Sequence, residues 1–464
     1  MGSITTANSR VSRWTPAIFA CALSNFVVAQ ILLVAGVSWP ASSSTAGATL
    51  AMVHLLTIGW ITMLMFGALF QFVPVLTGQR LWSQHLGLGT LSLIELGLAG
   101  MVSGLFLLGR PEALLLPAGG SLVIVGILAG VLNLAIPLAR KHPLPLSAQF
   151  VIVGMAMLLL TVALGLSFAL AFTVPALTRG LGPILTSGVE YHVLGGLGGW
   201  FTLTAIGVSY ELLPMFMLAP HDRGVWGKSV FWSASAGFIL ALASGLAAPH
   251  LSGLPSVAVE ALGQLGRACI AAAVALYLGD VARMYRDRRR RQIELHNRAA
   301  IGAFVSLAVA LVVAVVSSAL DDLGRMAAPL VFVLIFGWLG GLGMSQLYKI
   351  VPFLAWLSRF GRRLGAAPVP RVQDLVDERA AAYMFVAYFA SVAVAAVAAA
   401  AGFPLAVRAA MALTLAATVL LGREYWRAWQ GYYARLKPAA NPSRISTSPH
   451  REEAGHDNAR ASHA

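Results

Sequence analysis

The chain has 464 residues, of which 58% are hydrophobic and 11% are charged, and its mean hydropathy is +0.79. These values exclude a soluble globular domain and are typical of a polytopic membrane protein. The formal net charge of +14 does not indicate a nucleic-acid partner, because the basic residues concentrate in alternate loops between apolar segments. The expected surroundings of the chain are therefore membrane lipids.

Twelve apolar segments are long enough to cross a bilayer, at about 20 residues per span. They cover residues 14–36, 48–73, 86–108, 113–137, 147–173, 190–217, 229–248, 258–282, 299–318, 328–350, 380–401 and 405–421. We therefore predict an all-α polytopic membrane protein with twelve transmembrane helices.

The distribution of basic residues predicts the orientation of these helices. Only five of the 32 lysines and arginines fall in the odd-numbered loops or at the span ends on that side, namely Arg110, Arg179, Arg267, Arg325 and Arg408. This is the positive-inside pattern, which predicts cytoplasmic termini and a bacterial inner membrane. The arginine-rich run at 286–291 is interpreted first as a topology anchor, and second as a contact for anionic lipid head groups.

The chain is expected to have one membrane domain, residues 14–433, between a cytoplasmic N-terminus, 1–13, and a disordered cytoplasmic tail, 434–464. The first apolar segment has no convincing cleavage site, so it is predicted to be a span and not a signal peptide. Two cysteines, both within spans, imply no disulfide framework.

A short motif occurs three times along the chain. Gly-Trp is followed by proline 14 residues after the tryptophan, in the second, sixth and tenth spans, with an aromatic residue ten positions after each tryptophan. The three copies are Gly59-Trp60 with Phe70 and Pro74, Gly199-Trp200 with Tyr210 and Pro214, and Gly337-Trp338 with Tyr348 and Pro352. This period predicts three repeats of four spans, covering about 14–137, 147–282 and 299–421.

Two of these three spans carry a histidine in the outer third. His54 lies six residues before Trp60, and His192 lies eight before Trp200. Because positions two apart on a helix point in roughly opposite directions, the two histidines need not face the same compartment.

The pattern resembles subunit I of the heme-copper oxidase superfamily, especially the C-type cytochrome c oxidases and nitric oxide reductases. The segment from His54 to Pro74 is similar to the second helix of that family, where the histidine binds the low-spin heme. Tyr191-His192 through Pro214 is similar to the sixth helix, where the histidine binds copper or non-heme iron. The segment from Gly337 to Pro352 is similar to the tenth helix. The resemblance thus implies heme or copper near His54 and His192.

Several ligands of that family are missing from this chain. The tenth helix of the family carries two heme-binding histidines, and the matching positions here are Leu330 and Phe332. The seventh helix of the family supplies two more metal ligands, whereas residues 229–248 contain no histidine. A heme iron without its proximal ligand is neither held nor tuned, so the family's full reduction of dioxygen or nitric oxide is not expected.

Each histidine also has a simpler interpretation. An intramembrane histidine is a candidate ligand, but an interhelical hydrogen bond is the alternative for His54. The glycines that follow His192 leave room for a flat cofactor or, alternatively, for another helix. Met52 and Cys21 are candidate sulfur ligands for copper, but such residues more often only pack.

Polar residues elsewhere in the spans suggest further roles. Glu95, midway along the third span, and Glu211, near the inner end of the sixth, are candidates for a proton or ion path. The alternatives are a hydrogen bond to a neighbouring helix for Glu95, and pairing with Lys349 or interfacial snorkelling for Glu211. Arg267 is a candidate for holding heme propionates, with pairing to Glu260 or to a lipid head group as the alternative.

The sequence therefore supports three hypotheses about function. The first is a metal or heme protein acting in respiration, nitric oxide handling or metal-centre assembly, with an electron donor or respiratory subunits as partners. The second is an ion, proton or metal transporter on the same scaffold without a redox cofactor. The third is a non-catalytic subunit of a respiratory complex. Whether the chain is an enzyme is left open.

Overall fold

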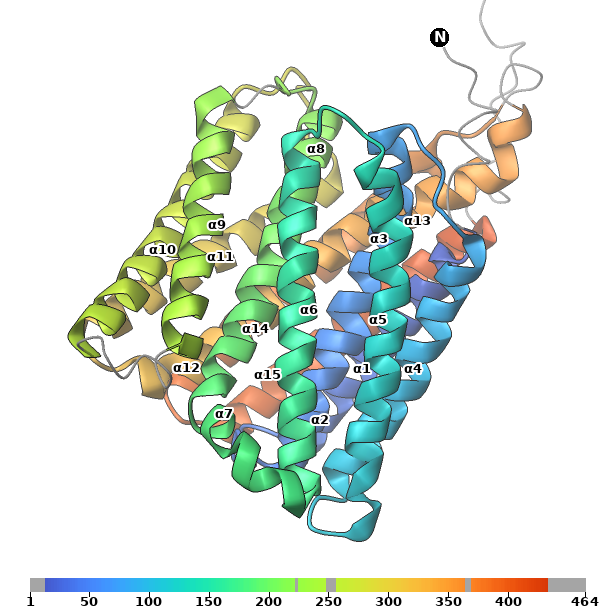
Figure 1. Cartoon of the computed structure of the whole chain (residues 1–464). Coiled ribbons are helices and arrows are strands. Elements are labelled where there is room, and N and C mark those ends of the chain that lie inside the picture. The colour runs from blue at the N-terminus through green and yellow to red at the C-terminus, as the bar shows by residue number, and fades with distance from the viewer. Residues whose placement is uncertain (1–12, 222–223, 248–255, 364–368, 433–464) are drawn as a thin grey trace, which may run out of the picture.

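The computed structural model describes residues 13–432 except 222–223, 248–255 and 364–368, and the predicted tail, 434–464, lies outside this part. The described residues form an all-helical bundle whose long helices run side by side (Figure 1). Twelve of its helices are long and apolar enough to cross a membrane. The predicted fold class, all-α with twelve spans, is confirmed.

The first repeat contains four spans. They are α1 (Thr15–Ala35), a continuous helix made of α2 (Gly47–His54), η2 (Leu55–Thr62) and α3 (Met63–Thr77), then α4 (Gln84–Phe106), and η3 (Pro111–Leu114) continuing into α5 (Leu115–Ala139).

The second repeat has the same order of elements. Its spans are α6 (Leu146–Thr173), the continuous helix α7 (Pro175–Val193), η4 (Leu194–Thr202) and α8 (Leu203–Met217), then α9 (Gly224–Ala247) and α10 (Ser256–Arg286).

The third repeat follows the same plan. It comprises α11 (Leu295–Ala319), the continuous helix α12 (Leu323–Phe332), η6 (Val333–Gly340) and α13 (Gly341–Phe360), then α14 (Glu378–Ala400) and α15 (Pro404–Gln430), with the short η7 (Gly361–Arg363) and η8 (Val372–Leu375) before α14.

Every Gly-Trp pair lies in a short π-helical segment. The segments η2, η4 and η6 are eight, nine and eight residues long, and each interrupts an α-helix at the same place in its repeat. A π-helix widens the helix and shifts its hydrogen bonds by one residue, and in proteins it frequently occurs at functional sites. The repeated motif thus encodes a local distortion as well as a span.

The glycine of each motif allows the first helix of the same repeat to pack directly onto the π-helical backbone. A Cβ atom on this glycine would lie 2.7 Å from the Cβ atom of its neighbour in each repeat, which is closer than real contacts allow. The three neighbours are Asn25 on α1 for Gly59, Met157 on α6 for Gly199, and Ser306 on α11 for Gly337. A side chain at any of the three positions would separate the two helices.

The three tryptophans are fully buried and link the repeats in a cycle. Trp60 of the first repeat lies against Gly343 of the third. The Nε1–H of Trp200, in the second repeat, donates to Thr62 Oγ1 of the first at 3.2 Å. Trp338 of the third repeat meets Tyr277 of the second edge-on, with ring centroids 6.4 Å apart. Each tryptophan therefore fastens its own repeat to a different one.

Each proline of the motif lies inside a helix and is buried. Proline has no amide hydrogen, so it leaves the carbonyl four residues earlier without its helical donor. In all three repeats that residue is the aromatic one of the motif, listed here as Phe70, Tyr210 and Tyr348. The spacing of the motif therefore places a large buried ring at the point where the helix loses a hydrogen bond.

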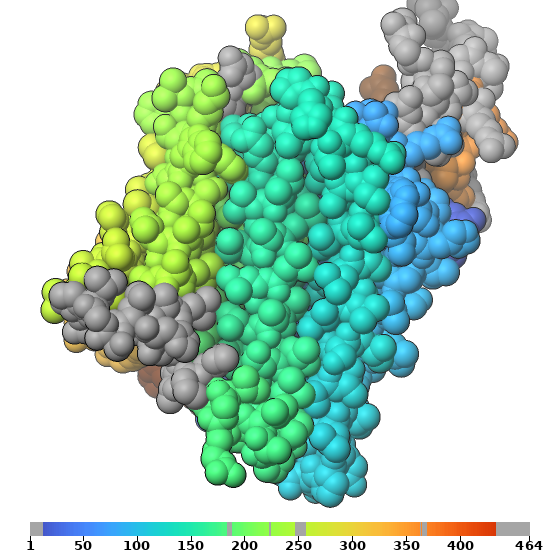
Figure 2. Space-filling view, in the orientation of Figure 1, coloured from blue at the N-terminus to red at the C-terminus, as the bar shows by residue number. Residues whose placement is uncertain are grey.

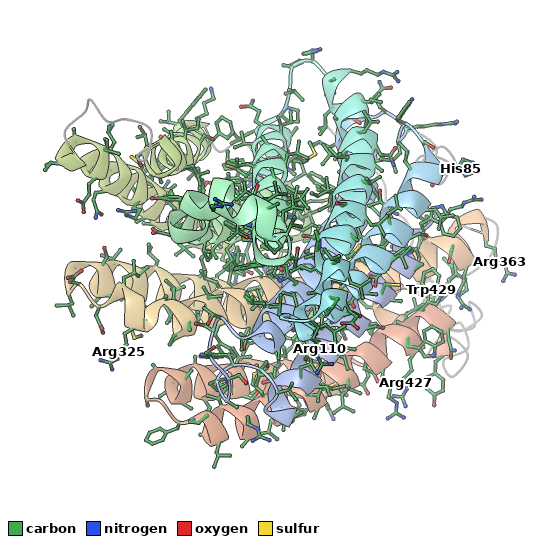
Figure 3. All side chains as sticks on the ribbon, turned by 60° about the horizontal axis from the view of Figure 1, so that its bottom comes forward. His85, Arg110, Arg325, Arg363, Arg427 and Trp429 are labelled. Carbon is green, nitrogen blue, oxygen red and sulfur yellow. The ribbon has the colours of Figure 1, made fainter. Side chains whose placement is uncertain are left out.

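The two ends of the bundle differ in their residues. We call them the histidine end, which holds His54 and His192, and the proline end, which holds the three motif prolines. In Figure 3, Arg363, His85 and Trp429 lie on one side of the molecule and Arg325 lies on the opposite side, as alternating loops require. Side chains of α5, α6 and α9 meet over the face shown in Figure 2, so the second repeat lies directly beside the first.

Candidate functional site

His54 is the last residue of α2, immediately before the π-helical segment η2. Its ring is partly buried, and Nδ1 lies 2.7 Å from the carbonyl oxygen of Leu50, one turn earlier. Because a carbonyl can only accept, Nδ1 carries the hydrogen and donates. In the neutral ring, Nε2 is then the nitrogen with a free lone pair.

His192 is held in the same way by a different helix. It lies one residue before the end of α7, and its Nδ1 donates to the carbonyl oxygen of Thr161 on α6 at 2.9 Å. Phe168 meets the His192 ring edge-on with centroids 5.5 Å apart. A Cβ atom at Gly165 would lie 3.0 Å from Cε1 of His192, so the missing side chain at 165 makes room for the ring.

The residues of α6 around His192 were not predicted from the sequence. Thr161, Gly165 and Phe168 follow one another at intervals of four and three, so they lie on one face of α6. This spacing could have indicated a shared helix face, but it did not indicate that the face contacts His192.

The structure brings the two histidines together. The rings of His54 and His192 lie with centroids 6.5 Å apart and planes tilted by 40°. The sequence left open whether they share a compartment, because they differ by two residues in their distance from the tryptophan. Because the two histidines stand on different helices, a difference in helical phase within each helix does not keep their rings apart.

The separation of the two ring centroids agrees with the binding of one metal ion by both rings. A metal held by two imidazole nitrogens at about 2 Å each would place the ring centroids about 6 Å apart, close to the 6.5 Å observed. Within the described residues neither Nε2 has a hydrogen-bond partner, and neither is sealed off in the way that Nε2 of His296 is. Backbone carbonyls on the Nδ1 atoms fix the ring tautomers, as second-shell partners do in metal sites.

Neighbouring helices pack directly against the glycine-rich π-helical segment η4 after His192. Positions where a Cβ would stand on Gly195, Gly198 and Gly199 lie within 2.7 Å of atoms of Thr161, Phe238 and Met157 respectively. These glycines therefore serve helix packing, the simpler of the two interpretations made from the sequence. No flat cofactor fits against their backbone without displacing those side chains.

No third strong ligand joins the pair in the part of the chain that the structure describes, where no group of three or more His, Cys, Asp or Glu residues is gathered for a metal. The sulfur of Met52 accepts a hydrogen bond from Ser38 at 3.1 Å. Cys21 lies partly buried on α1 near Glu95 and not near the histidines. The hypothesis of a sulfur ligand from these two residues gains no support.

One of the two positions that match the missing tenth-helix histidines, Phe332, belongs to a cluster of aromatic rings. Phe332 is 4% exposed and packs against Trp39 and Phe336, with centroids 5.9 and 4.8 Å apart. Phe26 stacks on Trp60 at 4.6 Å and contacts Phe336 at 5.8 Å. Between the first and third repeats the chain therefore has an apolar aromatic cluster where the resembled family has heme ligands.

Arg267 lies near the same end of the bundle and bridges two helices of the second repeat. Its guanidinium is 3.5 Å from the carboxylate of Glu190, two residues before His192, and Nε lies 3.4 Å from Oε1 of Gln264. The alternative partner considered from the sequence, Glu260, is not the one observed. With side chains 34% and 63% exposed, this pair contributes little to stability.

Glu211 does not pair with Lys349. Lys349 binds Glu294, the residue before α11, which also binds Arg290 and lies 3.4 Å from Nδ1 of His296. Glu211 makes no hydrogen bond or ion pair within the described chain. Burial raises the pKa of Glu294, but the hydrogen bond from Lys349 and the nearby positive charges outweigh it, so the pKa lies below its ordinary value.

Glu95 has a partner on α1. The side-chain amide of Asn25 donates to both carboxylate oxygens, at 2.9 and 3.2 Å. This is the hydrogen bond to a neighbouring helix that the sequence left as the alternative to a proton or ion path. The hydrogen bond does not itself decide between them, because a carboxylate in a proton path also needs a donor.

A comparison with solved structures identifies the architecture. A heme-copper terminal oxidase, solved by cryo-electron microscopy as a dimer, matches with a TM-score of 0.52 and 12% sequence identity, over 92% of this chain and 83% of the oxidase chain. The chain has a heme-copper oxidase-like fold. A scan against protein-family models finds no match. A search of curated proteins likewise finds no significant match. At this identity the likeness extends to the fold alone.

Proposed function

We propose that this protein holds one redox-active metal, copper or a heme iron, between His54 and His192, and that it acts in respiratory metal handling and not as a fully liganded terminal oxidase. The observation that carries the proposal is the 6.5 Å approach of two histidine rings from different repeats. Both are oriented by backbone carbonyls so that Nε2 remains available.

The donor set favours copper over zinc. Neutral imidazoles suit copper, iron and zinc, but zinc almost always takes four ligands, and the described residues supply two. Copper is the first candidate. A heme iron with two axial imidazoles is the second candidate. Arg267, which pairs with Glu190 two residues before His192, would then bind the heme propionates.

The residues of the site have separate roles in this proposal. When bound, the metal would either supply one-electron chemistry or itself be passed on to another protein. Thr161 and Leu50 fix the tautomers of the two rings, and Gly165 leaves room for His192. Phe168 packs edge-on against the His192 ring, and the aromatic cluster around Phe332 keeps the contact between the first and third repeats apolar.

The test is metal and heme analysis of the detergent-purified protein together with its reduced-minus-oxidised optical spectrum. The variants are His54→Gln, His192→Gln and the double substitution, with His85→Gln as a control at the exposed proline end. We expect one copper or one heme per chain in the wild type and the control, and loss of that metal in each single variant.

The rival hypotheses predict different results. A metal-free, colourless wild type would contradict the proposal and favour the transporter or the non-catalytic subunit. Metal that persists in the double variant would place the site elsewhere. If copper reaches the protein only when reconstituted vesicles carry a copper gradient, Glu95 and Glu211 become the first residues to test for an ion path.

A further inference from the structure

A polar seam faces outward between α1 and α4, at mid-depth in the bundle. Glu95 is the twelfth of the 23 residues of α4, and Asn25 is the eleventh of the 21 residues of α1, so both lie at the centres of their spans. Both side chains are partly exposed, and Ser24 and Ser92 beside them are exposed. We define these four residues as the α1–α4 seam.

The seam interrupts a surface that is otherwise apolar. On α1, Val28 and Ile31 continue the exposed stripe of Ser24 at intervals of four and three residues, with 45% and 48% exposure. On α4, Leu96 follows Ser92 by one turn and is 63% exposed. These stripes face the hydrocarbon of the bilayer, so the carboxyl group of Glu95 lies at the edge of a lipid-facing surface.

The floor of the seam is the π-helical segment η2. Asn25 and Leu98 lie against Gly59 from the two sides, so no side chain of η2 separates α1 from α4 at this level. The amide of Asn25 also lies 3.4 Å from the carbonyl oxygen of Gly59. One amide nitrogen is therefore shared between the Glu95 carboxylate and the π-helix.

The carboxylate lacks a positive partner. Asn25 is the only residue of the described chain that donates a hydrogen bond to Glu95, and none of its cations forms an ion pair with it. A charged carboxylate in the bilayer interior is costly unless it is paired. The cost falls if a cation from outside this chain completes the site.

The other two repeats show that the fold does not require this polarity. The contact that Asn25 makes with Gly59 is made by Met157 with Gly199 and by Ser306 with Gly337. Neither of these residues is bound to a carboxylate. Met157 has no side-chain donor, and Ser306 donates to the carbonyl of Gly302 on its own helix. The three-fold repetition thus acts as an internal control, and Glu95 is a specific feature of the first repeat.

From these observations we propose that the α1–α4 seam is a docking site for a single transmembrane helix of a partner subunit, whose lysine or arginine at mid-depth pairs with Glu95. The small side chains of Ser24 and Ser92 permit close approach of a second helix, as small residues do at helix interfaces in membranes. Asn25 holds the carboxylate toward the incoming cation. The proposal does not depend on the presence of a metal at His54 and His192.

The test uses synthetic single-span helices of leucine and alanine, with one lysine at the centre or with none. Each labelled peptide is reconstituted with the labelled full-length protein in vesicles, and association is measured by energy transfer. We expect the lysine peptide to associate roughly tenfold more strongly than the host peptide, in line with polar contacts between membrane helices. Glu95→Leu should abolish the difference.

Two further variants make the test specific. Ser92→Leu keeps the carboxylate but fills the seam, and it should also abolish preferential binding of the lysine peptide. Val386→Leu, at a 68% exposed apolar position of α14, should leave it unchanged. Each variant is first shown to elute as a monodisperse species with unchanged helical content.

Three outcomes would overturn the proposal. One is equal association of the lysine and host peptides, which would mean that Glu95 is simply protonated in the membrane. The second is preferential binding of the lysine peptide that persists in both the Glu95→Leu and the Ser92→Leu variant. The third is Glu95-dependent self-association of the protein without peptide, which would make a second copy of this chain the occupant.

Discussion

The rings of His54 and His192 lie 6.5 Å apart although the two residues come from different repeats and stand at different distances from their tryptophans. Helical phase alone does not predict this approach, because it describes each helix separately. The approach follows from the packing of α6, which binds His192 through Thr161 and accommodates it at Gly165. The candidate site is thus built by the contact between repeats.

Gly165 should control the position of His192. In Gly165→Ala, the new methyl group would lie 3.0 Å from Cε1 and push the ring away from α6. We expect metal affinity to fall roughly tenfold, as it does when residues that orient a ligand are changed, with only a small loss of stability. The measurement is metal retention during titration with a chelator. Gly279→Ala is the control, because a Cβ there meets nothing within 4 Å, and unchanged retention in Gly165→Ala would contradict the assigned role.

The number and order of the spans could be predicted because the bilayer imposes a length and an apolar composition on each helix. The ends of two helices were predicted less well. The tenth and twelfth were expected to end at residues 350 and 421, but they continue to Phe360 and Gln430. Charged residues end an apolar segment of the sequence, but they do not end a helix. In the extended part of α15 the charged residues Arg427 and Glu424 pair with each other.

The π-helical segments and the partners of the charged residues could not be predicted. No sequence rule links a Gly-Trp pair to a π-helix, although the threefold recurrence of the pair marked the place in each repeat where the π-helical segment lies. Lys349 was considered as a partner of Glu211, but it binds Glu294, 55 residues away. Such choices depend on which helix ends meet in space, and one sequence does not contain that information.

The glycine of the motif should be intolerant of a side chain in all three repeats. Alanine at Gly59 would place its Cβ 2.7 Å from Asn25, and the same substitution at Gly199 or Gly337 would meet Met157 or Ser306. We expect each to lower the free energy of unfolding by about 1–3 kcal/mol, the usual cost of overpacking. Thermal unfolding in mild detergent measures this effect. Gly89→Ala on α4, where a Cβ meets nothing within 4 Å, should be neutral or slightly stabilising, and three neutral motif variants would refute the packing argument.

The hydrogen bond between Trp200 and Thr62 should couple the first two repeats. Both residues are buried, and the bond joins η4 to the last residue of η2. In a double-mutant cycle with Trp200→Phe and Thr62→Val, we expect a coupling free energy of about 0.6 kcal/mol, the average for such bonds between membrane helices. Equilibrium unfolding of the four proteins provides the measurement. Strictly additive effects would show that the bond contributes nothing beyond packing.

Glu294 should make stability depend on pH at the proline end. Its carboxylate is 11% exposed and lies among Lys349, Arg290 and His296, which together hold its pKa below the ordinary value of 4.5. A depressed pKa means that the contribution to stability is complete above the unfolded-state pKa and is lost as the pH falls through the folded-state value. Glu294→Gln should therefore lower the free energy of unfolding by about 2 kcal/mol at neutral pH, less than the loss of a fully buried pair. The difference in stability between the variant and the wild type should disappear at acidic pH.

The test is to measure unfolding midpoints from neutral pH down to about one unit below the carboxyl's ordinary pKa. Glu112→Gln, at an exposed position of η3, is the control. A gap that stays constant across this range would mean that the charge of Glu294 does not stabilise the junction of α11 and α13.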